Sequence, residues 1–196
     1  MPFSPYSSHL PWMERLKDEL KAVRQKTAHG KWFLPRARLK QVLTKERVLR
    51  HLLEFGVASE LVEESLHRII HSALKILAIL IVVEQDALIT DFLAHDLTDG
   101  SLPLFATTIP VANVSHKFFD RQWEYIAPIF KRRNVVLRLQ EDHILPFLED
   151  VRMDDADGGY ANAFIVSLDP DHQEIELANG DKVCTRPAML PLVSSP

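Results

Sequence analysis

The segment between Ser59 and Glu84 constrains the fold of this chain more than any other. Its first half alternates apolar and charged residues at the spacing of one helix face. Its second half includes eight consecutive apolar residues, Ile76 to Val83. A helix that is apolar on all sides lies at the centre of a bundle, and a membrane span needs about 20 such residues. We therefore expect a helix over 60–84 that forms the centre of a helical bundle.

Three shorter helices are predicted before this central helix. Ser8 can cap the first one, Pro11 suits its opening turn, and Gly30 is the expected stop. Thr44 can cap the third helix, and Gly56 suits its left-handed end. The apolar face of the first helix carries Trp12, Leu16, Leu20 and Val23. The second and third helices are expected over Arg36–Leu43 and Lys45–Phe55.

Two further helices are predicted after the central one. Asp86 can cap a helix over Ala87–His95. A loop over 101–114 then leads to Ser115, which precedes an aromatic-rich helix over His116–Phe130. The aromatic residues of this helix are expected in the core or at a domain interface; they are Phe118, Phe119, Trp123, Tyr125 and Phe130. Pro128 is expected to kink or end that helix.

The pattern changes after Arg133, where short apolar runs are bounded by turn residues. Asn179-Gly180 is a hairpin signal, and Asp169-Pro170-Asp171 is a turn. Strands are expected over 135–139, 164–168 and 174–177. The predicted fold class is therefore mainly α, with a helical bundle over residues 1–133 and a small β-hairpin region over residues 134–196.

The charge is distributed unevenly around a net value of −4. Residues 1–50 hold 12 Lys and Arg against 4 Asp and Glu, whereas residues 140–181 hold one Arg against 12 Asp and Glu. A basic surface that binds nucleic acid or an anionic membrane is one alternative, although ordinary solvated charge is favoured and nucleic acid is not the expected partner. Its residues would be Arg15, Lys17, Lys21, Arg24, Lys26, Lys31, Arg36, Arg38 and Lys40.

The expected compartment is intracellular, either cytoplasmic or nuclear. Cys184 is the single cysteine, which suits a reducing compartment and leaves no internal disulfide. The N-terminal residues lack a charged region followed by an apolar one, so no secretory signal is predicted, and no transmembrane segment is expected.

A glycine-containing segment late in the chain matches the nucleotide-binding loop of protein kinases incompletely. That loop reads G-x-G-x-x-G-x-V and precedes a strand with V-A-I-K. Gly158 stands at its second glycine, followed by Gly159 and by Tyr160 at the loop tip. The other two glycine positions hold alanine, three aspartates bring negative charge, and Arg186 stands where the lysine would be. We expect a β-hairpin turn here rather than a working nucleotide site.

The order of several pieces in this chain resembles a filamentous-fungal protein-kinase-like family, in which a helical domain precedes a kinase domain. The resemblance covers roughly 43–172 and includes Phe118–Phe130 with its Gln-Trp and Ala-Pro pairs, then Ile144–Phe147, Gly158–Tyr160 and Asp169–His172. It implies that the β region corresponds to a truncated, degenerate first lobe of a kinase. The nucleotide-loop residues that it implies are Gly158, Gly159, Tyr160 and Arg186.

The resemblance implies a non-catalytic role as an accessory or interaction module, with a protein partner or self-association. No catalytic residue, metal or other cofactor is expected for this chain. One alternative is that it is the N-terminal fragment of an active serine/threonine kinase, and ATP with magnesium would then be expected only if a complete kinase domain followed. Downstream sequence encoding a catalytic aspartate and a metal-binding Asp-Phe-Gly would distinguish these readings.

Two histidine-containing groups are weaker candidates for a site. Glu64, His67 and His71 share one helix face at a spacing that can hold a divalent metal. Partly exposed surface histidines are the favoured interpretation. Asp91 and His95, with the adjacent Asp96, could suggest acid–base chemistry, but a solvated helix end is favoured. His116 and Asp120 are expected to form an i, i+4 pair.

Overall fold

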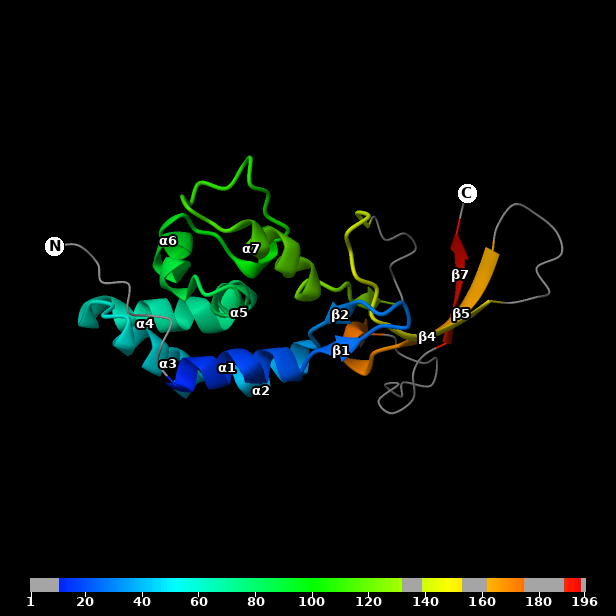
Figure 1. Cartoon of the computed structure of the whole chain (residues 1–196), viewed down its shortest axis with the longest axis horizontal. Coiled ribbons are helices and arrows are strands. Elements are labelled where there is room, and N and C mark those ends of the chain that lie inside the picture. Colours follow the sequence, from blue (N-terminus) through cyan, green and yellow to red (C-terminus); the bar gives the residue numbers. More distant parts are fainter. Residues whose placement is uncertain (1–10, 132–138, 153–161, 175–188, 195–196) are drawn as a thin grey trace.

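A computed structural model describes residues 11–131, 139–152, 162–174 and 189–194. Helices gather at one end of an elongated molecule and a three-stranded sheet lies at the other (Figure 1). The mainly α fold class is therefore confirmed. The α-helices are α1 Pro11–Ala22, α2 Arg36–Val42, α3 Lys45–Glu54, α4 Ser59–Arg68, α5 Leu74–Val82, α6 Ile89–Ala94 and α7 His116–Arg121.

The predicted central helix is present but contains a break. A π-helical turn, Ile69–Ala73, joins α4 to α5. Nearly every residue of α5 is buried, and the main apolar cluster contains Leu77, Ile79 and Leu80 at 0% exposure. The helix Ser59–Val82 is long and apolar enough to cross a membrane by length and composition, yet 56% of its most apolar window is buried inside the protein. Core helices of soluble proteins pass the same test, and the burial favours that role here.

Two predicted helix boundaries around α3 are confirmed. The Thr44 side chain accepts a hydrogen bond from the backbone N–H of Arg47 at 3.5 Å, which caps the helix. At the other end, Gly56 adopts φ +67°, a left-handed conformation that glycine reaches without steric strain. The α2 helix also agrees with its predicted range to within one residue.

The expected stop of the first helix at Gly30 is wrong. The helix ends at Ala22, and a short antiparallel hairpin follows, formed by β1 Gln25–Lys26 and β2 Trp32–Phe33. Gly30 lies in the turn of this hairpin with φ +80°, and its N–H donates to the carbonyl of Thr27 at 2.9 Å. Two-residue strands carry no readable hydrophobic period, so the sequence pattern could not separate them from a helix end.

The aromatic-rich helix is shorter than predicted. It ends at Arg121 and passes into a 3₁₀ turn, Gln122–Glu124. The carbonyl of Glu124 accepts the N–H of Leu34 at 2.7 Å, which ties this turn to the segment after β2. Pro128 lies four residues after Glu124 and has no N–H to donate to that carbonyl, so an α-helix could not continue through it. Phe130 lies instead in β3, Phe130–Lys131.

The expected cap at Asp86 is also wrong. Residues Asp86–Leu88 form a 3₁₀ turn whose N-cap is Gln85, and the structure assigns that cap no side-chain hydrogen bond. Asp86 is 4% exposed and faces His51 of α3, with 3.8 Å between the Asp86 Oδ2 and His51 Nδ1 atoms. Asp86 is therefore a buried core residue beside His51 and not the N-cap of the following helix.

The C-terminal region holds more strand than predicted. A three-stranded antiparallel sheet has the order β4-β5-β7, with β4 Phe147–Arg152, β5 Asn162–Leu168 and β7 Met189–Ser194. The predicted strand over 164–168 is confirmed within β5, whereas β4 and β7 were not predicted. A separate parallel pair joins β3 to β6 Gln173–Glu174. The Asn179-Gly180 hairpin and the strand over 135–139, except Leu139, lie outside the described residues.

The N-terminal hairpin packs on this C-terminal region rather than on the bundle alone. Ala28 donates its N–H to the carbonyl of Phe147 at 2.8 Å. Phe33, which is 0% exposed, forms a small apolar cluster with Ala127 and Ile144. The short hairpin of residues 25–33 thus helps to build the β region, although it lies far from it in sequence.

Candidate interaction groove

The residues predicted for a nucleotide loop lie outside the described residues. These are Gly158, Gly159, Tyr160 and Arg186. The flanking strands are described: β4 ends at Arg152 and β5 begins at Asn162, and the two pair in an antiparallel register. The third strand, β7, begins at Met189. The predicted loop therefore connects two neighbouring antiparallel strands, and its own geometry stays a prediction.

The described surface has a groove at the other end of the molecule, between α1 and α3. It encloses about 240 Å³. Trp12 supplies apolar surface above the buried Leu16, and three arginines with one glutamate supply charge. The residues that line it are Trp12, Arg15, Leu16, Glu19, Arg47 and Arg50.

The packing of the two helices fixes the walls of the groove. Leu16 and Leu20 of α1 are 3% and 0% exposed, and Val48 and Leu52 of α3 are 1% and 0% exposed. All four belong to the main apolar cluster. Because these four residues point into the core, other positions on each helix face outward. Residues three or four apart share one helix face, so Arg15 and Glu19 form the rim on α1, and Arg47 and Arg50 form the rim on α3.

Trp12, Arg50 and Glu54 contact one another at one end of the groove. Its indole Nε1 donates to Glu54 Oε2 at 2.5 Å. The Arg50 guanidinium lies 4.6 Å from the Trp12 ring centroid and its Nε donates to Glu54 Oε1 at 2.8 Å. A cation over an indole face is favourable by roughly 0.5–1 kcal/mol at an exposed site. Glu54 thus holds the ring and the guanidinium together, which preorganises a flat apolar and cationic surface.

The other two arginines differ in their pairing. Arg47 Nη1 lies 2.5 Å from Glu19 Oε2 and also donates to the carbonyl of Val42 at 3.0 Å. Arg15 donates its Nε to the carbonyl of Pro11 at 3.3 Å, but it has no ion pair with any carboxylate in the described ranges. Its guanidinium therefore keeps the donors that could bind an external carboxylate in bidentate fashion.

A buried histidine lies on the same helix as two of the groove arginines, and no local pattern predicted its burial. His51 of α3 is 1% exposed and its ring lies 4.3 Å from that of Phe55. Burial lowers the pKa of His51 to about 4, while the backbone of Asp86 and the charge of Glu54 act in the opposite direction. His51 is therefore uncharged at neutral pH.

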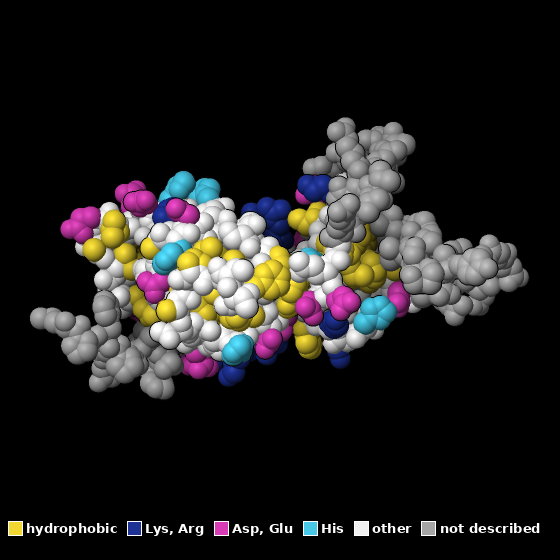
Figure 2. Space-filling model, turned by 90° about the horizontal axis from the view of Figure 1, so that it is seen from above, with side chains coloured by type: hydrophobic (Ala, Val, Ile, Leu, Met, Phe, Trp, Pro, Cys, Tyr) yellow, Lys and Arg dark blue, Asp and Glu magenta, His cyan; other side chains and the backbone are white. Residues whose placement is uncertain are grey.

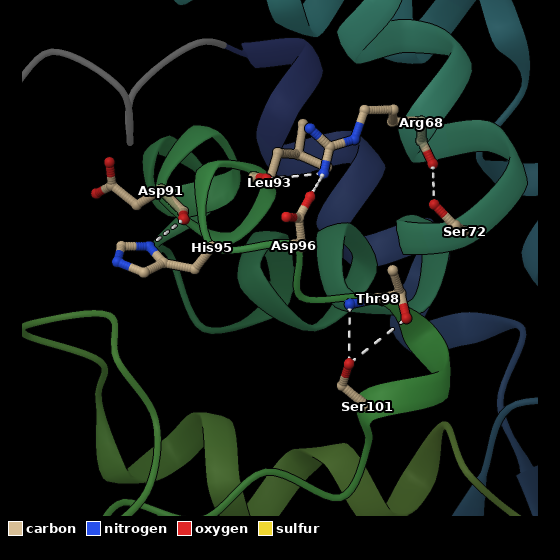
Figure 3. A network of polar contacts seen from close by, with 8 residues as sticks. All are labelled: Arg68, Ser72, Asp91, Leu93, His95, Asp96, Thr98 and Ser101. Carbon is tan, nitrogen blue, oxygen red and sulfur yellow. Dashed lines mark hydrogen bonds and ion pairs between the residues drawn. The ribbon is translucent and has the colours of Figure 1, made fainter.

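The other groups weighed from the sequence occupy defined places in the bundle (Figure 3). Arg68 Nη2 contacts Asp96 Oδ1 at 2.7 Å and donates to the carbonyl of Leu93 at 2.8 Å. His95 lies with its Nδ1 atom 2.9 Å from the carbonyl oxygen of Asp91. These contacts join α4 to the end of α6, which agrees with a solvated helix end rather than an acid–base site.

The histidine face of α4 is built differently from the expected three-residue cluster. His67 and His71 stack, with ring centroids 4.1 Å apart. No group of three or more His, Cys, Asp or Glu side chains is arranged to hold a metal ion in the parts of the chain that the structure describes. Glu64 therefore does not complete a three-ligand site, and the expected ion pair between His116 and Asp120 does not appear within those same ranges.

Two motif pieces of the family resemblance have structural roles. The Gln122 amide makes a two-way contact with Leu104: its Oε1 accepts from the Leu104 N–H at 2.7 Å and its Nε2 donates to the Leu104 carbonyl at 2.9 Å. In the Asp-Pro-Asp-His turn, Asp171 Oδ2 accepts the N–H of Ala37 in α2 at 3.2 Å. His172 is 3% exposed and contacts the carbonyl of Pro128 at 3.2 Å.

The aromatic residues of the same block lie in the core, as expected. Phe118 and Tyr125 are 0% and 3% exposed, and burial raises the pKa of the Tyr125 hydroxyl. Phe119 packs against the main cluster and Trp123 against the smaller one. These side chains therefore stabilise the join between the bundle and the β region and do not line the groove.

The proposed basic surface is partly neutralised. Arg24 pairs with Glu124 at 2.8 Å, Lys17 pairs with Glu84 and Glu14, and Lys21 lies 3.8 Å from Asp18. Basic and acidic side chains are also interspersed on the face shown in Figure 2. The described surface therefore presents mixed charge on that face rather than a continuous basic field.

Comparisons with known proteins identify no relative of this chain. No family model, no curated protein and no solved structure matches it.

Proposed function

We propose that this chain is a non-catalytic interaction module that binds an acidic segment of a partner protein in the groove between α1 and α3. The observation that carries the proposal is the composition of that groove. It combines an indole ring held in place by Glu54 with a guanidinium, that of Arg15, that has no carboxylate partner among the described residues. Aromatic and arginine side chains are the residue types that dominate binding energy at protein interfaces.

The chemistry of the groove selects the kind of segment. The Trp12 ring offers apolar surface for one aliphatic or aromatic side chain, and the buried Leu16 forms the floor beneath it. Arg15 offers a bidentate donor pair for a carboxylate next to it. Arg47 and Arg50 are already paired with Glu19 and Glu54, so they hold the walls rather than supply free charge. A short segment in which apolar and acidic residues alternate would match this arrangement.

The proposal includes membership of a fungal kinase-like family, with the β region as a degenerate first lobe. Its support is the resemblance of the motif pieces in order, together with the antiparallel strands β4 and β5 that flank the glycine-containing segment. Sequencing the transcript beyond Pro196 tests this part. A continuation without a catalytic aspartate and Asp-Phe-Gly agrees with it, whereas one containing both would favour the alternative of an active kinase that binds ATP and magnesium.

The groove is tested by the affinity for a defined probe, a fluorescein-labelled peptide in which leucines alternate with aspartates. Fluorescence anisotropy with the full chain should give saturable binding. Arg15→Ala should weaken it by about five-fold, since an exposed charge pair contributes at most about 1 kcal/mol. Arg15 is exposed and makes one long hydrogen bond, so the variant should fold normally.

Lys45→Ala is the matched control. Lys45 is an exposed cation in the first turn of α3 that does not line the groove. The Lys45→Ala variant removes one positive charge from the same pair of helices, as Arg15→Ala does, and should change the affinity by less than about two-fold. Equal weakening by both variants would mean that the peptide responds to overall charge, and the groove would no longer be the proposed site. Retained affinity in Arg15→Ala would also overturn it.

A further inference from the structure

We propose that His67 and His71 form a bidentate surface site for a divalent transition-metal ion that prefers imidazole ligands, such as Zn²⁺, Ni²⁺ or Cu²⁺. The two residues are four positions apart across the junction of α4 and the π turn, and both are exposed. Histidines at i and i+4 on one helix face are a recurrent metal-binding pair in proteins. The site is separate from the α1–α3 groove.

The contact of His71 with the backbone determines which of its nitrogens is available. Its Nδ1 lies 2.9 Å from the carbonyl oxygen of His67. A carbonyl oxygen can only accept a hydrogen bond, so in the neutral ring Nδ1 carries the proton and Nε2 keeps its lone pair. Metal-binding histidines in proteins are commonly oriented by this kind of second contact. His71 is therefore preorganised to offer Nε2 to a cation.

The two rings lie close enough for one ion to reach both, although they must leave the stacked arrangement to bind it. The centroids are 4.1 Å apart and the ring planes differ by 21°. Tetrahedral zinc with bonds of about 2.0–2.1 Å places two ligand nitrogens about 3.3 Å apart. Because stacked rings point their lone pairs in nearly parallel directions, the His67 ring must turn about its side-chain bonds before a nitrogen of each ring reaches the same ion.

The π turn supports this reading independently. Two side chains of this turn contact carbonyl oxygens four residues earlier. Ser72 Oγ donates to the carbonyl of Arg68 at 2.7 Å, and His71 Nδ1 contacts that of His67. Such turns occur frequently at functional sites. Because the described residues supply no third ligand, water, buffer or a partner would complete the coordination. We therefore expect modest affinity and the order Cu²⁺ above Ni²⁺, with no response to Mg²⁺.

The chain contains a matched control in His95. It is exposed, and its Nδ1 contacts the carbonyl of Asp91 at the same distance of 2.9 Å (Figure 3). No second histidine stacks on it within the described ranges. It therefore reproduces the orientation of His71 without the partner ring.

Competition of tag-free protein with a chromophoric chelator at neutral pH tests the proposal with Zn²⁺, Ni²⁺ and Cu²⁺. His67→Gln and His71→Gln should each weaken binding by about ten-fold or more, because the second imidazole binds at high effective concentration. His95→Gln should bind like the natural chain. Equal affinity in the natural chain and His67→Gln, or equal loss in His95→Gln, would overturn the proposal.

A second measurement separates metal binding from a folding defect. Metal at ten times its dissociation constant should raise the Tm of the natural chain and of His95→Gln by roughly 3–6 °C. At the same metal concentration the rise should fall to about 1 °C or less in His67→Gln, because its binding is weaker by ten-fold or more. The Tm of this variant without metal should stay close to that of the natural chain, since the substituted side chain is exposed. An undiminished rise in His67→Gln would contradict a shared site.

Discussion

The carboxylate of Asp99 accepts the backbone N–H of Lys75, at 3.0 Å to Oδ1 and 3.1 Å to Oδ2. Its Oδ1 also accepts the N–H of Ile76 at 3.1 Å. These donors belong to the first turn of α5, directly after the π turn. A residue 24 positions along the chain thus caps a helix that begins in the middle of a longer one, and it compensates for the backbone donors that the break exposes.

Asp99→Ala should destabilise the protein by about 2 kcal/mol, because it removes a cap and leaves partly buried N–H groups without their acceptor. Urea unfolding, followed by circular dichroism, measures the change as a lower midpoint with an unchanged slope. Asp91→Ala is the control, since Asp91 is exposed and its side chain makes no described hydrogen bond. A loss of stability in Asp99→Ala no larger than in Asp91→Ala would contradict the capping role.

Protonation of His51 should make stability depend on pH. Its pKa is lowered from 6.5 to about 4 in the folded protein, chiefly by burial. Between these values the unfolded chain binds more protons, so the free energy of unfolding should fall as the pH decreases from about 6.5 to 4. One proton changes it by up to about 1.4 kcal/mol per pH unit. Burial also lowers the pKa of His172, which adds to the same trend.

His51→Leu is the test of that assignment, and the slope of stability against pH is the quantity to compare. We expect urea unfolding between pH 4.5 and 6.5 to show a slope reduced by about 1 kcal/mol per pH unit in this variant. Leu53→Ala, which changes an exposed residue without a titratable group on the same helix, should keep the slope of the natural chain. An unchanged slope in His51→Leu would place the titrating group elsewhere.

Gln122→Ala should loosen the loop that follows Pro103. The variant leaves the N–H and carbonyl of Leu104 without the amide that now pairs with both, and an unmet buried backbone pair costs about 2 kcal/mol. Hydrogen exchange should become faster at Leu104, and the Tm should fall. Gln41→Ala, an exposed position on α2, should leave both quantities unchanged. Unchanged hydrogen-exchange protection at Leu104 in Gln122→Ala would contradict a role of the Gln122 amide in holding this loop.

Gly56→Ala and Gly100→Ala form a matched pair. Gly56 has φ +67°, and a Cβ there would meet nothing within 4 Å. Its substitution should therefore cost about 1 kcal/mol through backbone strain alone. At Gly100 a Cβ would lie 3.5 Å from Thr98 Oγ1, an ordinary contact, and no left-handed φ is required, so the change should be near neutral. Equal unfolding free energies for the two variants would contradict this account.

The sequence predicted those parts of the bundle that depend only on residues close together in the chain. The Thr44 cap, the Gly56 stop and the apolar run of 76–83 each depend on residues within one or two turns, and all three are confirmed. The π turn could not be predicted because Asp99, which caps the helix after it, is distant in sequence. The hairpin of residues 25–33 was missed because its strands are only two residues long.

The candidate groove could not be predicted for a related reason. Its walls come from α1 and α3, and neither Trp12 nor Arg47 belongs to a local motif. The only available signal was that Trp12 precedes an amphipathic helix in which charged residues flank the apolar face. The nucleotide loop, by contrast, was predicted from a partial match to the glycine-rich kinase motif, but Gly158 and its neighbours lie outside the described residues.

Exchanging the charges of Arg15 and the peptide is the sharpest test of whether the groove binds an acidic segment through Arg15. Arg15→Glu should weaken binding of the aspartate-containing peptide more than Arg15→Ala does, because a like charge then faces the carboxylate. A peptide with lysine in place of the aspartates should bind Arg15→Glu more tightly than it binds the natural chain. We expect this reversal of peptide preference. Identical peptide preference in the natural chain and Arg15→Glu would contradict it.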